Sequence, residues 1–153
     1  MALEHPQVRM PPPLIHLGGL LVGYGLDQVT GWRFTPAAWL DGLALGLALA
    51  AVVLSGWTLA TLRRHRTTVL PHRAASTLVT GGPFRWSRNP IYLAFTLLHL
   101  GCGLALGSPG MLIMLVPVFY VMDRHVIAAE EAFHEQAFGT QWQHYRKQAR
   151  RWL

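Results

Sequence analysis

Two groups of polar side chains border apolar stretches in the second half of the chain, and their types could bind a charged ligand. The first group lies in the segment GGPFRWSRNPIY at 81–92 and comprises Arg85, Arg88, Asn89 and Tyr92. The second group is acidic and lies at 123–135. A basic group at a helix start favours a carboxylate, whereas acidic side chains favour an amine or hydroxyls. Together the two groups suit a zwitterionic, polyhydroxylated ligand.

The Asn-Pro pair at 89–90 predicts where the helix that carries Tyr92 begins. Proline suits the first turn of a helix because the N–H that it lacks would have no partner there, and Asn89 is a favourable N-cap residue. An apolar run to Gly107 follows. The first polar group is therefore expected at one end of a hydrophobic helix.

The composition indicates that these helices lie in a membrane. Of 153 residues, 52% are hydrophobic and 13% are charged, about half the charged share of an average soluble domain. Apolar segments occupy 14–26, 36–62, 91–107 and 110–129, and the last is predicted to continue as a helix through EEAFHEQAF. We therefore expect an all-α, polytopic membrane protein with about four transmembrane helices, a C-terminal helical hairpin and an amphipathic cytoplasmic tail.

We expect one membrane domain over residues 1–153. It would comprise two N-terminal spans at 14–62, a basic cytoplasmic loop at 63–90, a hairpin with the site at 91–138, and an amphipathic tail at 139–153. Gly-Ser-Pro-Gly at 107–110 predicts the turn of the hairpin. Arginines concentrate in the loop and the tail, so the positive-inside rule places both termini and the site in the cytoplasm, with the spans in a bacterial inner membrane. The net charge of +6 fits anionic lipid rather than nucleic acid, because the basic residues share one membrane face.

Helical spacing divides the acidic group between two faces. One face would carry Asp123, Ile127, Glu130 and His134, and the adjacent face Arg124, Ala128, Glu131 and Glu135. Counted from Gly110, Asp123 lies roughly 20 Å along the helix, a depth at which ionisable side chains are costly and indicate a site. In the alternative interpretation, Arg124 pairs with a carboxylate and the two glutamates are solvated.

Three segments of the second half resemble a known family. They are LVTGGPFRWSRNPIY at 78–92, GCG at 101–103 and EEAFHEQAFGTQWQHYRKQARRWL at 130–153. Their order and spacing over about residues 76–153 resemble the isoprenylcysteine carboxyl methyltransferase and phospholipid N-methyltransferase superfamily of membrane methyltransferases. Phe84 stands where that family usually has tyrosine, and Asn89 where its carboxyl methyltransferases prefer histidine, so the methyl acceptor stays open.

The resemblance implies an S-adenosylmethionine-dependent methyltransferase whose hairpin and tail enclose the cofactor. The catalytic residues that it implies are Arg88, Asn89, Tyr92 and Glu130. The cofactor-binding residues, taken with the polar groups above, are Arg85, Arg88, Asn89, Pro90, Tyr92, Gly101, Gly103, Glu130, Glu131, His134, Tyr145 and Arg146. Direct in-line transfer would reach a lipophilic acceptor: an isoprenylcysteine-like carboxylate, an amino-lipid or a thiol. An amine would have to lose a proton, which Glu130, Glu131 or His134 could take.

Several of these residues also allow a structural interpretation or a different function. Glu131 and His134 have the spacing of di-iron ligands, but the sequence lacks the second such motif, so we expect no metal. His16 and His99 are expected to be hydrogen-bonded core residues. The tail at 139–153 also suits an anchor on anionic lipid. The alternative function is a non-catalytic helical membrane scaffold or transporter component, which would leave the arrangement of Arg88, Asn89 and Glu130 unexplained.

Overall fold

A computed structural model of the protein describes residues 10–65 and 77–153. Within these ranges the chain is helical and has no strand, as the all-α prediction requires. The elements are α1 (Pro12–Thr30), α2 (Ala38–Arg64), a short 3-10 helix η1 (Gly82–Arg85), α3 (Pro90–Ala105), α4 (Pro109–Val121), a π-helical segment η2 (Met122–Ile127), α5 (Ala128–Phe138) and α6 (Thr140–Gln148). Residues 1–9 and most of the predicted basic loop, 66–76, lie outside the described residues.

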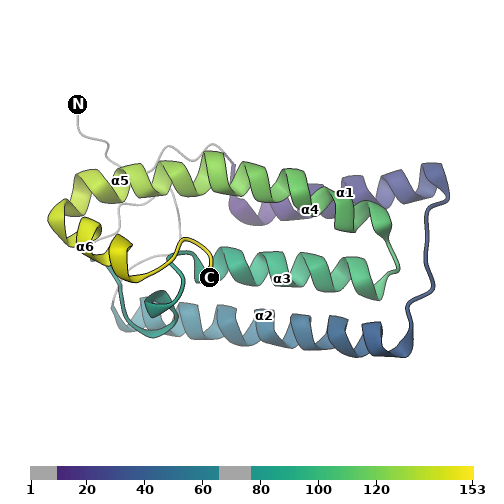
Figure 1. Ribbon diagram of the computed structural model, residues 1–153, viewed down its shortest axis with the longest axis horizontal. Helices are drawn as coiled ribbons and strands as arrows, with labels where there is room; N and C mark the ends of the chain where they lie inside the picture. Colours follow the sequence, from purple (N-terminus) through teal and green to yellow (C-terminus); the bar gives the residue numbers. More distant parts are fainter. Residues whose placement is uncertain (1–9, 66–76) are drawn as a thin grey trace.

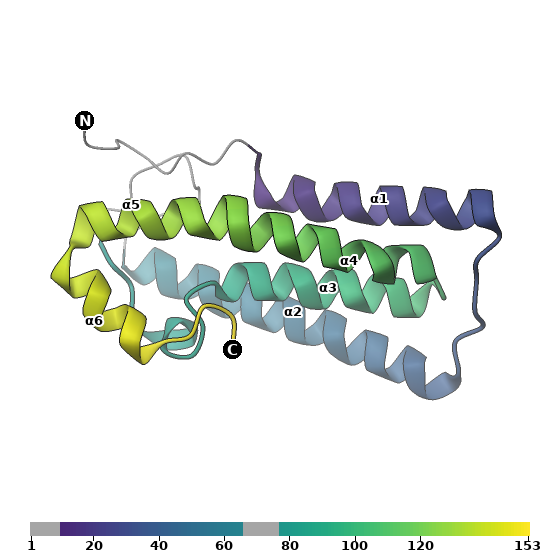
Figure 2. The ribbon, with the colours of Figure 1, turned by 45° about the horizontal axis from the view of Figure 1, so that its top comes forward.

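The long helices pack side by side in a bundle, and different segments of the chain lie at its two ends. α1 packs against α4 and α3, and α2 packs against α3, so that α4 lies between α1 and α3 in Figure 2. The connections α1–α2 and α3–α4 lie at one end (Figure 1). The start of α3, the helix α6 and the C-terminus lie at the other end (Figure 1). The two polar groups predicted from the sequence are therefore brought to the same end of the bundle.

Among the described residues, two helices are long and apolar enough to cross a membrane. They are α2 and the continuous helix Pro109–Phe138, which joins α4, η2 and α5. The protein buries only 17% of the most apolar window of α2, and Leu45, Val52 and Val53 on this helix are more than 60% exposed. Such a large unpartnered apolar face suits hydrocarbon rather than water. Helices α1 and α3 pack beside these two, and the expected four spans stay a prediction.

A buried carboxylate organises the end of the bundle away from the polar groups. Asp27 in the last turns of α1 accepts hydrogen bonds from the Ser108 hydroxyl and from the backbone N–H of Gly110 (2.8 Å). The Ser108 oxygen in turn caps α4 by accepting from the N–H of Met111 (3.1 Å). A negative charge is favourable at a helix N-terminus, so Asp27 fixes the predicted turn between α3 and α4.

The histidine pair expected in the core lies between α1, α3 and α4. The Nδ1 atoms of His16 and His99 are 3.4 Å apart, and His99 Nε2 is 3.1 Å from the carbonyl oxygen of Met111. Both side chains are at most 5% exposed. The expectation of hydrogen-bonded core histidines is confirmed, and the pair helps to hold these helices together.

We predict that Gly23→Ala destabilises the bundle whereas Gly25→Ala does not. A Cβ atom at Gly23 would lie 2.6 Å from backbone atoms of Met111, and backbone cannot move aside as a side chain can. Overpacking of this kind costs about 1–3 kcal/mol. A Cβ at Gly25 would meet nothing within 4 Å in the part of the chain that the structure describes, and alanine there gains up to about 1 kcal/mol of helix propensity. Thermal unfolding in detergent, followed by circular dichroism, measures both; an unchanged midpoint for Gly23→Ala would contradict the close α1–α4 contact.

Candidate active site

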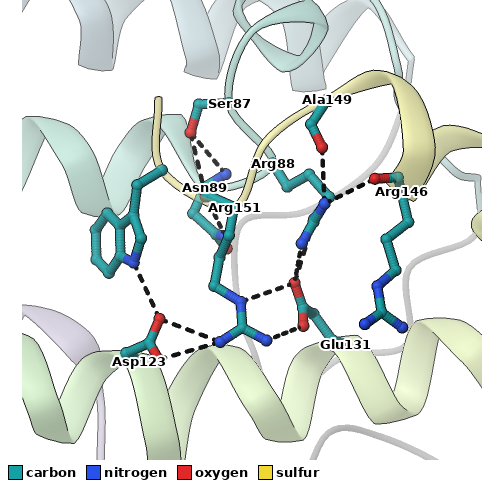
Figure 3. A network of polar contacts seen from close by, with 9 residues as sticks. Ser87, Arg88, Asn89, Asp123, Glu131, Arg146, Ala149 and Arg151 are labelled. Atoms are coloured by element: carbon teal, nitrogen blue, oxygen red, sulfur yellow. Dashed lines mark hydrogen bonds and ion pairs between the residues drawn. The ribbon is translucent and has the colours of Figure 1, made fainter.

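Arg88, just before α3, ties α5 to the C-terminal tail. Its Nε and Nη2 donate to one carboxylate oxygen of Glu131 at 3.2 and 2.8 Å. Its Nη1 donates to the carbonyl oxygens of Ala149 (2.7 Å) and Arg146 (3.1 Å). The side chain is only 9% exposed, so these charge-assisted hydrogen bonds form with little competition from water. Figure 3 shows this arginine between the carboxylate and the tail.

Arg151 binds the same carboxylate from the tail. Its Nη2 donates to Glu131 at 2.5 Å, and its Nη1 donates to both oxygens of Asp123 at 3.1 and 3.2 Å. The hydrogen bond to Glu131 raises the pKa of Arg151 above its ordinary value. Trp152 adds a hydrogen bond from Nε1 to Asp123 (3.0 Å) and stacks on Phe119. Figure 3 shows the Arg151 guanidinium between the two carboxylates.

The Asn89 side chain does not cap α3, contrary to the prediction. Asn89 occupies the N-cap position without a side-chain capping bond, and its Nδ2 donates instead to the carbonyl oxygen of Arg151 (2.8 Å). Beside it, the N–H of Arg88 donates to the carbonyl oxygen of Arg150 (2.8 Å). The amide is thus used to hold the last residues of the chain against the start of α3, a contact that local sequence does not reveal.

Glu130 has a different environment from Glu131 although the two are adjacent in sequence. The Tyr92 hydroxyl donates to Glu130 Oε1 at 2.5 Å, and Glu130 has no cationic partner among the described residues. Tyr92 is 6% exposed and packs with Met122 and Val126. Within residues 10–65 and 77–153, one glutamate is therefore neutralised by two arginines, whereas the other is bound by a neutral hydroxyl from an apolar cluster.

The π-helical segment η2 changes which acidic residues share a face. The sequence prediction grouped Asp123 with Glu130, at a spacing of seven residues. In the structure Arg151 bridges Asp123 and Glu131, which are eight residues apart. An i→i+5 turn takes in one extra residue, so two turns that include η2 span about eight residues. Arg124, which the sequence prediction placed on the same face as Glu131, is mostly exposed. Its Nε lies 3.8 Å from Oδ2 of Asp123, a long ion pair.

Helix α6 adds an aromatic wall to the site. The ring centroids of Trp142 and His134 are 5.0 Å apart. The guanidinium carbon of Arg88 lies 5.8 Å from the Trp142 ring centroid. Trp142 Nε1 and His134 Nδ1 are buried and have no hydrogen-bond partner among the described residues. Because an unpaired buried polar atom is costly, these two atoms are suited to meet polar atoms of a ligand.

Of the tail residues predicted from the sequence, Tyr145 and Arg146 both reach this cluster. Burial raises the pKa of the Tyr145 phenol, so its hydroxyl stays protonated and donates to the carbonyl oxygen of Phe84 (2.7 Å). Arg146 contributes its carbonyl oxygen to Arg88, while its side chain is exposed. Both residues fasten α6 to the segment before α3.

Three of the predicted cofactor-binding residues do not join the cluster. A Cβ at Gly101 would lie 3.1 Å from the Ala44 carbonyl oxygen of α2, and one at Gly103 would lie 2.6 Å from the Leu112 side chain of α4. These glycines are roughly 16–20 Å along α3 from Pro90, and they allow close helix packing rather than contact with a ligand at this site. Arg85 is exposed and makes no polar side-chain contact with the described residues.

Sequence reasoning missed Arg151 and Trp152, which make much of the cluster. The signal for them was the RRWL terminus, where a basic pair and an aromatic residue follow an amphipathic helix.

In residues 10–65 and 77–153, no three His, Cys, Asp or Glu side chains are grouped so that they could hold a metal ion.

Comparison with known proteins identifies one family. The family model described as phospholipid methyltransferase matches residues 41–141, from the start of α2 to the start of α6. The match includes Arg88, Tyr92, Glu130 and Glu131 and leaves out α1 and the last twelve residues. No curated protein and no solved structure matches the chain.

We predict that Arg151→Ala loosens the tail whereas Arg150→Ala does not. The first substitution removes the bonds to Asp123 and Glu131, and hydrogen bonds to charged groups contribute about 1.5–3 kcal/mol. Amide hydrogen exchange in residues 149–153 should then be about tenfold faster or more. To the described residues, the Arg150 side chain donates a single long bond, which reaches the Leu153 carbonyl oxygen (3.5 Å), and the side chain is exposed. Mass spectrometry of the exchanged protein compares the two variants, and equal exchange in both would show that the contacts of Arg151 do not hold the tail.

Proposed function

The chain belongs to the phospholipid methyltransferase family, a family of membrane methyltransferases, and from this we propose that it moves a methyl group from S-adenosylmethionine to a membrane lipid. We assign the acceptor to the amino-lipid class; an isoprenylcysteine-like carboxylate and a thiol are the alternatives. The site is the cluster around Glu130, Glu131, Arg88 and α6.

The observation that carries this proposal is the unequal state of the two adjacent glutamates. Glu131 is held by two guanidinium groups, so it positions the tail and has no free capacity for a proton. Among the described residues, Glu130 has a hydrogen bond from the Tyr92 hydroxyl and no cation, and Tyr92 itself packs in an apolar cluster. A carboxylate without a cation is costly in such a place and is stabilised by a positive charge or a proton. An amine acceptor supplies both, because its nitrogen becomes positive as it accepts the methyl group and then loses a proton.

The residues present fit the cofactor. S-adenosylmethionine supplies a methyl group that its sulfonium sulfur activates. The unpaired His134 Nδ1 and Trp142 Nε1 are suited to its polar atoms, and Glu130 to its positive charge. The other residues that we assign to the pocket shape its walls or hold the tail over it: Arg88, Asn89, Pro90, Tyr92, Glu131, Tyr145 and Arg146.

The chain's own residues then have four tasks. Tyr92 orients the Glu130 carboxylate by its hydrogen bond, and Glu130 takes the proton that an amine acceptor loses. The apolar side chains around Tyr92, which include Met122 and Ile127, keep water from the reacting groups. The clamp of Arg88 and Arg151 on Glu131 keeps α6 and the tail in place, so that the acceptor and the methyl donor are held in line.

We propose a cytoplasmic site at the inner surface of a bacterial inner membrane. Arg63 and Arg64 end α2, and Arg146 and Lys147 end α6, at the end of the bundle that holds the site. The positive-inside rule assigns that end to the cytoplasm. With α1 and α3 as further spans, the domain crosses four times and both termini are cytoplasmic.

We predict that Glu130→Gln abolishes most methyl transfer, whereas Glu135→Gln on the same helix does not. Loss of a general base lowers the rate about 10²–10⁴-fold, while Glu135 contacts Gln143, away from Tyr92. Purified protein in nanodiscs of phosphatidylethanolamine is given methyl-labelled S-adenosylmethionine, and label in the lipid fraction is counted. Label on an isoprenylcysteine or thiol probe and none on the amine would change the acceptor class. Label on no probe with the folded wild-type protein would favour the scaffold or transporter alternative.

A further inference from the structure

An apolar groove runs between α1 and the continuous helix of α4 and η2. Its volume is about 590 Å³, within the usual range of ligand pockets. It is lined by Leu14, Ile15 and Val22 of α1 and by Met114, Val121 and Val126 of the facing helix. His125 is its one ionisable lining residue in the described part of the chain. This surface suits a hydrocarbon chain.

The length and setting of the groove match one leaflet of a bilayer. Met114 and Val126 are twelve residues apart, about 18 Å along the helix, while half of the hydrocarbon core measures about 15 Å. Both residues belong to the helix Pro109–Phe138, which is long and apolar enough to cross a membrane. In a bilayer that this helix crosses, the groove would lie at the depth of the lipid tails.

Two neighbouring glycines define the floor of the groove. A Cβ at Gly19 would lie 2.4 Å from Val118, so this glycine brings the two helices together. A Cβ at Gly18 would meet no atom of the described residues within 4 Å, although Gly18 lines the groove. Gly18 thus keeps open a space that any larger side chain would fill.

The inner end of the groove lies close to the proposed site. Val126 lines the groove and also packs in the core cluster with Tyr92, whose hydroxyl binds Glu130. Glu130 is four residues beyond Val126, about 6 Å along the helix. A lipid with one chain in the groove would have its head group at the level of Glu130. Because α1 lies outside the matched range 41–141, the family match assigns nothing to this wall.

We propose that the α1–α4 groove holds a hydrocarbon chain of the acceptor lipid, so that α1 sets the chain length the protein accepts. The inference rests on the proposed function for the identity of the lipid. The step is binding alone, and the groove supplies no reacting group.

The test fills the groove with Gly18→Leu and uses Gly25→Leu as the matched control. Both substitutions replace a glycine of α1 whose Cβ position is open, and leucine is the better helix former in both places. Equal or higher melting temperatures than wild type show that both variants fold. The probes are palmitoyl and hexanoyl phosphatidylethanolamine, with methyl-labelled S-adenosylmethionine as donor.

For Gly18→Leu we expect the ratio of palmitoyl to hexanoyl methylation to fall about tenfold or more, because the long chain competes with the leucine for one space. Gly25→Leu should keep the wild-type ratio. An unchanged ratio in Gly18→Leu would overturn the proposal.

A second readout does not depend on activity. Palmitoyl phosphatidylethanolamine with a diazirine on its chain is photolysed in nanodiscs, and the labelled peptides are mapped. We expect labels at Met114 and Val121 in wild type and in Gly25→Leu, and their loss in Gly18→Leu. Labels equally strong on the exposed face of α2 as in the groove would overturn the proposal, even if no methyl transfer is detected and the proposed function fails.

Discussion

The carboxylate of Glu131 lies between two guanidinium groups, and the architecture of the site depends on this contact. Arg88 reaches it from the start of α3 and Arg151 from the tail. Three segments that are distant in sequence are held at one end of the bundle by one partly buried charge. Buried carboxylates are stable only when they are paired, and two arginines supply the pairing here. The same arginines hold the tail through carbonyl oxygens and Asp123, so the wall that α6 contributes depends on the same charge.

Because Glu131 takes both arginines, Glu130 is left with a neutral partner. The two glutamates project in different directions from one helix, and only one of them meets Tyr92. The π-helical turn η2 contributes to this division, since it aligns Asp123 with Glu131 rather than with Glu130. π-helical turns inside α-helices occur often at functional sites. In this chain the turn separates a structural carboxylate from one that can take a charge or a proton.

Much of the fold could be predicted from the sequence because its signals are local. Apolar runs gave the helices, the Gly-Ser-Pro-Gly turn gave the hairpin, and Pro90 marked the start of α3. The acidic and basic groups could also be assigned to one end, since a hairpin returns the chain to where it began. The contacts that depend on long-range packing could not be predicted. Helical spacing assumes a uniform turn, so it placed Asp123 with Glu130. The capping preference of asparagine could not show that the Asn89 amide binds the tail. The short Gly-Cys-Gly motif could not show that Gly101 and Gly103 face other helices.

The most direct measurement is a calorimetric titration of S-adenosylhomocysteine into the purified protein in nanodiscs, with Glu130→Ala and Arg88→Ala beside wild type. If the cluster around Glu130 is the cofactor site, wild type binds in the micromolar range and both variants lose most of the affinity. Glu130→Ala removes the carboxylate assigned to the ligand's positively charged groups, of which S-adenosylhomocysteine keeps the ammonium group, and Arg88→Ala releases the tail and the α6 wall. Folded wild-type protein that binds no S-adenosylhomocysteine, or binding that both variants retain in full, would contradict this assignment.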